Sequence, residues 1–128
     1  MAAQNILTQE QKVILEKAGF EVEEAMKRFM NSEQLWIKFL KKFKADSSYA
    51  DLVKAMGEGD RTKAFEAAHT LKGITGNLAL SRFNELISEQ TEYLRGAENN
   101  FEAAAAMMPQ ITAIYENTLK IIDEVCGG

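Results

Sequence analysis

The chain has 128 residues, a length that suits one domain (residues 1–128) with a substantial hydrophobic core. Its 15 basic and 19 acidic residues leave a net charge of −4, so charge gives no reason to expect nucleic-acid binding. Cys126 is the only cysteine, which excludes an internal disulfide and fits a reducing compartment. No apolar run approaches a membrane span, and the first residues do not resemble a secretory signal. We therefore expect a soluble, cytoplasmic protein without a membrane partner.

The first part of the chain, about residues 8–30, predicts two short helices. Thr8 and Gln11 form a capping-box pattern, and Gly19 is a typical helix stop. The next helix follows from apolar residues that recur at helical spacing, namely Val22, Ala25, Met26, Phe29 and Met30. Asn31 with Gln34 is then the predicted cap of a third helix.

Two more helices are predicted before the midpoint of the chain is passed. The helix after Asn31 has an apolar side opposite a basic one, and the basic side is formed by Lys38, Lys41, Lys42 and Lys44. Its apolar side is formed by Leu35, Trp36, Phe39, Leu40 and Phe43. Residues 46–48 interrupt the helical pattern and begin a short helix. The turn predicted at residues 57–60 ends that short helix. Asp60 is expected to cap a helix over residues 61–78.

The last third of the chain predicts two helices. Ser81 is the expected cap of one that ends at Gly96, and Asn99 with Glu102 is the expected cap of another over residues 100–125. Pro109 predicts a kink or break around residues 105–109. Short connections between amphipathic helices favour antiparallel neighbours. The predicted fold is all-α: an up-down antiparallel four-helix bundle over about residues 32–126, with additional N-terminal helices over about residues 8–30.

His69 is the only histidine of the chain and has an unusual place on its helix. At about 100° per residue it lies opposite the apolar side, together with Lys72, Gly73 and Gly76. The apolar side is formed by Ala64, Ala68, Leu71, Thr75 and Leu78, with Phe65 at its border. A glycine inside a helix costs roughly 0.8–1 kcal/mol relative to alanine. We expect the missing side chains to leave room for another molecule beside an exposed imidazole.

These residues also have an ordinary structural interpretation. A single helical histidine is most often a surface or core residue, and a lysine beside it is most often only solvated. Here the histidine faces away from the core, and the two glycines favour a site. Histidine ionises near neutral pH, and its unprotonated ring is a nucleophile. Lys72, one turn from His69, would neutralise an anionic group. The pattern therefore predicts a site for such a group and its carrier.

The segment Ala68–Leu78 reads Ala-His-x-Leu-Lys-Gly-x-x-Gly-Asn-Leu and resembles the signature of histidine-containing phosphotransfer (HPt) domains. The runs 22–29 and 39–43 also resemble the first half of that family. The resemblance implies that His69 takes a phosphoryl group from an aspartate on one receiver domain and passes it to another. Family sequences commonly have glycine where this chain has Ala79, which bears on the tightness of the turn after the helix.

The resemblance also implies the partners, which are response-regulator receiver domains and a hybrid histidine kinase. The chain has no metal cluster and no phosphate-binding loop, so we expect the receiver to bring Mg²⁺ and expect no cofactor, resident metal or ATP-dependent kinase activity. A monomer suffices for this mechanism. Ser88 or Thr91, on the neighbouring helix, is expected to hydrogen-bond to the ring nitrogen that does not attack. Cys126 is expected to lie in a frayed end.

Two other functions remain open at this point. One is a receiver-binding module that transfers nothing, although such a module needs neither His69 nor Lys72. The other is the phosphoacceptor domain of a larger, chemotaxis-type histidine kinase. The capped N-terminal helix and the lack of a linker favour a free-standing phosphocarrier instead.

Overall fold

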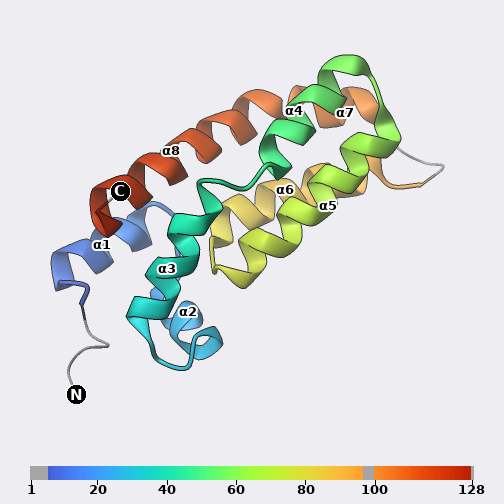
Figure 1. Ribbon diagram of the computed structural model, residues 1–128. Helices are drawn as coiled ribbons and strands as arrows, with labels where there is room; N and C mark the ends of the chain where they lie inside the picture. The colour runs from blue at the N-terminus through green and yellow to red at the C-terminus, as the bar shows by residue number, and fades with distance from the viewer. Residues whose placement is uncertain (1–5, 97–99, 128) are drawn as a thin grey trace.

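The computed structural model describes residues 6–96 and 100–127. Within these ranges the chain forms α-helices and no β-strand (Figure 1). The all-α prediction is therefore confirmed. The helices are α1 (Gln9–Lys17), α2 (Val22–Arg28), α3 (Glu33–Phe43), α4 (Ser48–Glu58), α5 (Arg61–Asn77), α6 (Ser81–Leu94), α7 (Phe101–Ala106) and α8 (Met108–Cys126). None of the helices in the described ranges is both long and apolar enough to cross a bilayer.

The bundle has four antiparallel arms, as the sequence predicted. Helices α3 and α4 run along it in one direction, α5 returns, α6 runs back, and α7 with α8 returns again (Figure 1). Helix α5 packs between α4 and α6, while α8 contacts both α6 and α3 and so closes the bundle. Two of the four arms are therefore broken helices, and α5, which carries His69, is one of the two continuous arms.

The break between α7 and α8 lies where Pro109 predicted it. Helix α7 ends at Ala106, and Pro109 stands in the first turn of α8, where a missing backbone N–H is tolerated. Near the break, the buried side chain of Gln90 donates from Nε2 to the carbonyl oxygen of Ala104 at 2.9 Å. This bond is a second one for the Ala104 carbonyl, which also accepts from the backbone N–H of Met107 at 3.2 Å, and it joins the end of α7 to α6.

Several predicted caps are confirmed. Thr8 and Gln11 exchange both bonds of a capping box, and Gly19 follows the end of α1 with φ 95°. Asp60 accepts a hydrogen bond from the backbone N–H of Lys63, so α5 begins where it was expected. These caps are local in sequence, and for that reason their residue types suffice to predict them.

Other predicted caps are wrong by one residue. Ser32, and not Asn31, caps α3, because its Oγ accepts from the N–H of Leu35 at 3.0 Å while Asn31 adopts φ 61°. Ser81 is the first residue of α6, whose cap is Leu80, without a side-chain hydrogen bond.

The cap of α7 also differs from the prediction. Asn99 lies outside the described residues, and the cap is Asn100, whose Oδ1 accepts from the N–H of Ala103 at 3.0 Å.

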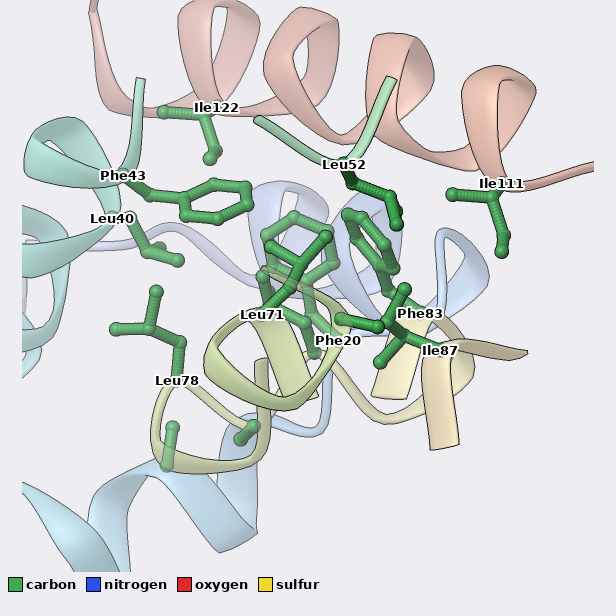
Figure 2. Packing of buried hydrophobic residues seen from close by; sticks show 14 of the residues in the cluster. Phe20, Leu40, Phe43, Leu52, Leu71, Leu78, Phe83, Ile87, Ile111 and Ile122 are labelled. Carbon is green, nitrogen blue, oxygen red and sulfur yellow. The ribbon is translucent and has the colours of Figure 1, made fainter. Parts of the chain in front are cut away.

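The hydrophobic core lies between the arms, and Figure 2 shows side chains of several arms pointing toward one another within it. Phe20, from the link between α1 and α2, lies among them and meets Trp36 edge-on at a ring-centroid distance of 6.4 Å. Trp36 donates from Nε1 to the carbonyl oxygen of Leu78 at 2.9 Å. The largest fully buried side chains are Trp36, Phe20, Phe83, Leu15, Leu40, Leu52, Leu71, Leu80, Ile87, Leu94, Ile111 and Ile122.

The two N-terminal helices close one end of the bundle. The N–H of Glu21 donates to the carbonyl oxygen of Ala79 at 2.9 Å, and the N–H of Arg82 donates to that of Gly19 at 3.2 Å. The link between α1 and α2 is thereby joined to the turn between α5 and α6. Ala79 takes φ 59° in this turn, so the alanine adopts the left-handed conformation for which glycine is better suited.

The C-terminal end of α8 is also held, which corrects the expected frayed end. Helix α1 packs on α8, and Gln11 donates from Nε2 to the carbonyl oxygen of Val125 at 3.3 Å. Cys126 is the last residue of α8 and is buried. The thiol is therefore part of the packed end of the bundle.

Candidate functional site

Helix α5 presents His69 to solvent, on the side opposite its buried residues. The buried residues of the helix are Ala64, Ala67, Ala68, Leu71 and Thr75. His69 itself is exposed, which is the orientation that the helical wheel predicted. The imidazole is thus open to another molecule, and α5 is held beneath it by packing against α4 and α6.

The surface beyond His69 is open at Gly73, one turn further along α5. A Cβ atom placed on Gly73 would meet no heavy atom of the neighbouring elements within 4 Å. The backbone of α5 is therefore bare on the side where a molecule would approach the imidazole. The open space at Gly73 is the feature that the predicted approach of a partner requires.

Gly76 has a different environment. It is half-buried, and a Cβ atom placed on it would lie 3.3 Å from Nδ2 of Asn84, which belongs to α6. The structure therefore gives Gly76 an internal reason to be glycine, because it lets the Asn84 side chain approach α5 closely. Its predicted part in partner approach has no comparable open space to support it.

Asn84 is a structural residue of the site that the sequence did not single out. Its Nδ2 donates to the carbonyl oxygen of Lys72 at 2.9 Å and to Oγ1 of Thr75 at 3.2 Å. Oγ1 of Thr75 in turn donates to the same Lys72 carbonyl at 3.1 Å. These bonds join α6 to the backbone of α5 at Lys72. An amide at this point of α6 was visible in the sequence, but its distance from Gly76 depends on the register of two helices.

The Lys72 side chain is half-buried and, among the described residues, forms no ion pair. Its aliphatic part can pack on the helix while the ammonium group remains in water. On the helix surface, residues three apart are neighbours, so this ammonium lies within reach of a group bound at His69. The predicted pairing of a cation with the histidine is thus compatible with the structure.

Ser88 and Thr91 do not contact the imidazole through a hydrogen bond in the described part of the chain. Thr91 is fully buried, and its Oγ1 donates to the carbonyl oxygen of Ile87 at 2.6 Å. Ser88 is half-buried and lies one helical turn from Asn84 on α6. The ring contact that the structure does give His69 is with Phe65, whose centroid lies 5.8 Å from that of the imidazole.

A mixed basic and apolar surface lies beyond His69, at the C-terminal end of α5. A hollow of about 230 Å³ separates α3 from the end of α5, and it is lined by Phe39, Lys42, Phe43, Asp46, Ile74, Asn77 and Leu78. Phe39 is exposed, and Nζ of Lys42 lies 5.1 Å from its ring centroid. The predicted basic side of α3 is exposed at Lys38, Lys41 and Lys42. Of these three lysines, Lys42 lines the hollow at the end of α5, whereas Lys38 and Lys41 line a different hollow beside Ser32.

No group of three or more His, Cys, Asp or Glu side chains is arranged to hold a metal ion within residues 6–96 and 100–127. The chemistry that the described side chains themselves offer is that of a nucleophilic imidazole beside a cation, on a surface with one bare helical turn.

The described residues thus form a helical bundle that presents one solvent-facing histidine on a continuous arm. The family model described as Hpt domain matches residues 34–120, which is more than half of the chain. The chain therefore belongs to the Hpt domain family, and the resemblance seen in the segment 68–78 is confirmed. Comparisons with curated proteins and with solved structures found no match.

Membership of this family establishes the general activity of the chain. Hpt domains carry out histidine phosphotransfer in two-component signalling and interact with response-regulator receivers. The match begins in α3 and ends within α8, so α1 and α2 lie outside it.

Proposed function

We propose that the chain is a phosphorelay intermediate in which His69 accepts a phosphoryl group from a receiver-domain aspartate and passes it to a second receiver. The observation that carries the proposal is the exposure of His69 beside the bare turn at Gly73. An aspartyl phosphate sits on the surface of another protein, so its acceptor must be reachable without rearrangement of the bundle. The exposed ring and the missing side chain satisfy this need.

The transfer requires one bond to form and one to break. A ring nitrogen of His69 uses its lone pair to form an N–P bond while the P–O bond to the donor carboxylate breaks, and that bond's electron pair returns to the carboxylate. The other ring nitrogen keeps its proton. In the second transfer, a carboxylate oxygen of the acceptor attacks phosphorus, and the N–P electron pair returns to the nitrogen. Such transfers depend mainly on in-line positioning and on charge neutralisation.

Lys72 has the second of these tasks in our proposal. We propose that the Lys72 ammonium lies closest to the phosphoryl oxygens in the transition state, so that its charge lowers the barrier more than it strengthens docking. We assign Mg²⁺ to the receiver, and we expect a hybrid histidine kinase upstream as the source of the phosphoryl group. The exchange is proposed to occur in the cytoplasm, with this chain as a monomer.

The test uses a receiver domain charged with ³²P-phosphate on its aspartate and then mixed with this protein. We expect His69 to become labelled with a phosphate that is stable in alkali and labile in acid, as an N–P bond requires. His69→Gln should abolish the label and leave the helical content unchanged. Label that survives this substitution would refute the assignment. A protein that binds receivers but never becomes labelled would instead be the non-transferring module.

Lys72→Ala tests the cation. We expect slower transfer at saturating receiver with a nearly unchanged dissociation constant, because the charge acts mainly in the transition state. Lys63→Ala is the matched control, since Lys63 is an exposed lysine on the first turn of the same helix. Equal losses in docking and transfer would give Lys72 a role in binding only.

A further inference from the structure

The imidazole of His69 is stacked on another ring of its own helix. Phe65 stands one turn earlier on α5, with the ring centroids 5.8 Å apart and the ring planes 18° from parallel. Offset parallel rings at this separation are a favourable aromatic arrangement. Phe65 is half-buried and packs against the hydrophobic core, so the ring on which the imidazole rests is itself anchored in the bundle.

Phe65 is also held from the neighbouring helix. Cζ of Arg95, which follows the end of α6, lies 5.3 Å from the Phe65 ring centroid, within the range of a cation–π contact. Nε of Arg95 pairs with a carboxylate oxygen of Glu92 at 3.0 Å, which orients the guanidinium. Beside this contact, Arg61 donates from Nη1 to the carbonyl oxygen of Leu94 at 3.0 Å and joins the start of α5 to the end of α6.

An exposed histidine would otherwise turn freely about its side-chain bonds. The lone pair of a ring nitrogen lies in the plane of the imidazole, so in-line attack on phosphorus requires one orientation of that plane. A stacked neighbour covers a face of the ring and leaves its edge, with the nitrogens, uncovered. Stacking therefore restricts rotation of the ring without obstructing the direction of attack, which lowers the entropy lost on reaching the reactive geometry.

We infer that Phe65 is a positioning residue for the phosphotransfer function proposed above: its ring, fixed by the core and by Arg95, orients the imidazole of His69 for attack. Phe65 touches neither the phosphoryl group nor the receiver's carboxylate in this role. It takes no part in the bonds that form and break, and its whole effect passes through the imidazole.

The test compares Phe65→Leu, which keeps an apolar side chain but removes the ring, with Phe65→Tyr, which keeps the ring. Phe101→Leu is the matched control, because Phe101 is a half-buried phenylalanine on another helix, α7. The first measurement is the proton NMR spectrum of the imidazole, which is unambiguous because the chain has one histidine. Loss of the ring current should move the imidazole C–H signals downfield in Phe65→Leu, and not in Phe65→Tyr or Phe101→Leu.

The second measurement is the single-turnover rate of phosphoryl transfer, first from phosphoramidate, a small donor that needs no docking, and then from a charged receiver at saturating concentration. With Phe65→Leu we expect both rates to fall roughly three- to tenfold, a range set by the strength of aromatic ring pairs. The dissociation constant for the receiver should change by less than about twofold, and Phe65→Tyr should restore the rate.

The failures can be told apart. A wild-type protein that takes no label from either donor would overturn the proposed function, and with it any positioning role. A labelled wild type with Phe65→Leu at the same rate, or with a loss matched by Phe101→Leu, would overturn the role of Phe65 alone. Imidazole signals that do not move in Phe65→Leu would show that the rings are not stacked in solution, which would also overturn it.

Discussion

Gly73 shows what a single missing side chain does at this surface. In the middle of a helix, glycine makes the folded state less stable than alanine does, by roughly 0.8–1 kcal/mol. At Gly73 an added Cβ atom would meet no heavy atom of the neighbouring elements within 4 Å, so alanine would bring no steric cost. Gly73→Ala should therefore raise the free energy of unfolding by up to about 1 kcal/mol. The added methyl group stands one turn from His69 and should slow phosphoryl transfer from a receiver. Denaturant unfolding and single-turnover labelling measure the two effects.

The bare turn would lose its explanation if Gly73→Ala transferred at the wild-type rate. Gly76 provides the comparison, since its Cβ would lie 3.3 Å from Nδ2 of Asn84 and would disturb bonds inside the protein. From the sequence alone, both glycines were predicted to lie on the side of α5 that a partner approaches. The helical wheel shows only on which side of a helix a residue lies. The neighbouring helix decides whether that side faces water or another side chain.

Ala79 is the one residue of the α5–α6 turn whose backbone conformation disagrees with its type. It adopts φ 59°, which costs an L-residue roughly 1–2 kcal/mol, while glycine adopts it freely. Ala79→Gly should raise the free energy of unfolding by about 0.5–1 kcal/mol, the relief being reduced by the greater freedom of glycine in the unfolded chain. Thermal unfolding of the two proteins measures the change.

Ala18→Gly is the control for that substitution. Ala18 also lies at the C-terminal end of a helix, but it is half-buried where Ala79 is buried, and its φ is −82°. Glycine therefore brings no relief there and should destabilise the protein. A loss of stability at both positions would mean that the turn after α5 is not strained by its alanine. The chain forms the turn between α5 and α6 with alanine at a position where family sequences commonly have glycine. We expect the cost in folding free energy to arise from the backbone of Ala79 alone.

At the scale of the elements, the junction of the α1–α2 link with the α5–α6 turn depends on Gly19. The residue has φ 95°, and a Cβ atom on it would lie 2.5 Å from Cβ of Arg82, closer than two such atoms can approach. Gly19→Ala should lower the free energy of unfolding by roughly 2 kcal/mol or more, from backbone strain and from overlap together. Chemical unfolding measures the loss.

Gly59→Ala separates the two causes. Gly59 also has a positive φ, 70°, but a Cβ atom placed there meets nothing within 4 Å, so only the backbone strain of roughly 1–2 kcal/mol is expected. Equal losses at the two glycines would show that the approach of Arg82 to the link is not close in solution, and the seating of α1 and α2 on this turn would then be in question.

The positions of the helices along the chain were predictable because each helix depends on a pattern of residues that are close together in the sequence. Apolar spacing and caps gave α5 to within one residue of its end, and Pro109 gave the break before α8. The cap of α3 was missed by one residue because Asn31 and Ser32 are both cap-forming and adjacent, so local preference cannot choose between them. The cap of α6 was missed because that helix begins at Ser81 itself, after a leucine whose side chain forms no capping hydrogen bond.

The candidate site was predictable only in part, for the same reason. The outward direction of His69 follows from the wheel of one helix. The contact of Arg95 with Phe65 and the bonds of Asn84 to Lys72 and Thr75 join two helices, and their distances depend on how α6 is placed along α5. No spacing within a single segment contains that information.

On the scale of the whole molecule, the helices outside the family match are built into the same core as the bundle. Leu15 of α1 and Phe20 of the following link are almost completely buried. Helix α1 also packs on α8, at the end of the molecule where the chain's single thiol lies. We therefore expect the reactivity of Cys126 to report whether α1 is seated on the bundle.

Burial raises the pKa of the Cys126 thiol above its ordinary value, against a smaller opposing effect of Lys41 and Lys44. Because the thiolate is the reactive form, iodoacetamide should alkylate the native protein slowly at neutral pH, and the rate should keep rising at alkaline pH beyond the range where a free cysteine levels off. Denaturant should abolish this protection.

Leu15→Ala, which loosens α1, should speed native alkylation about tenfold or more. Leu94→Ala removes an equally buried leucine from the last turn of α6 and should have a much smaller effect. That end of α6 and the C-terminal end of α8 lie at opposite ends of the bundle (Figure 1). Equal acceleration by both variants would mean that Cys126 reacts only through global unfolding, and that α1 does not shield it.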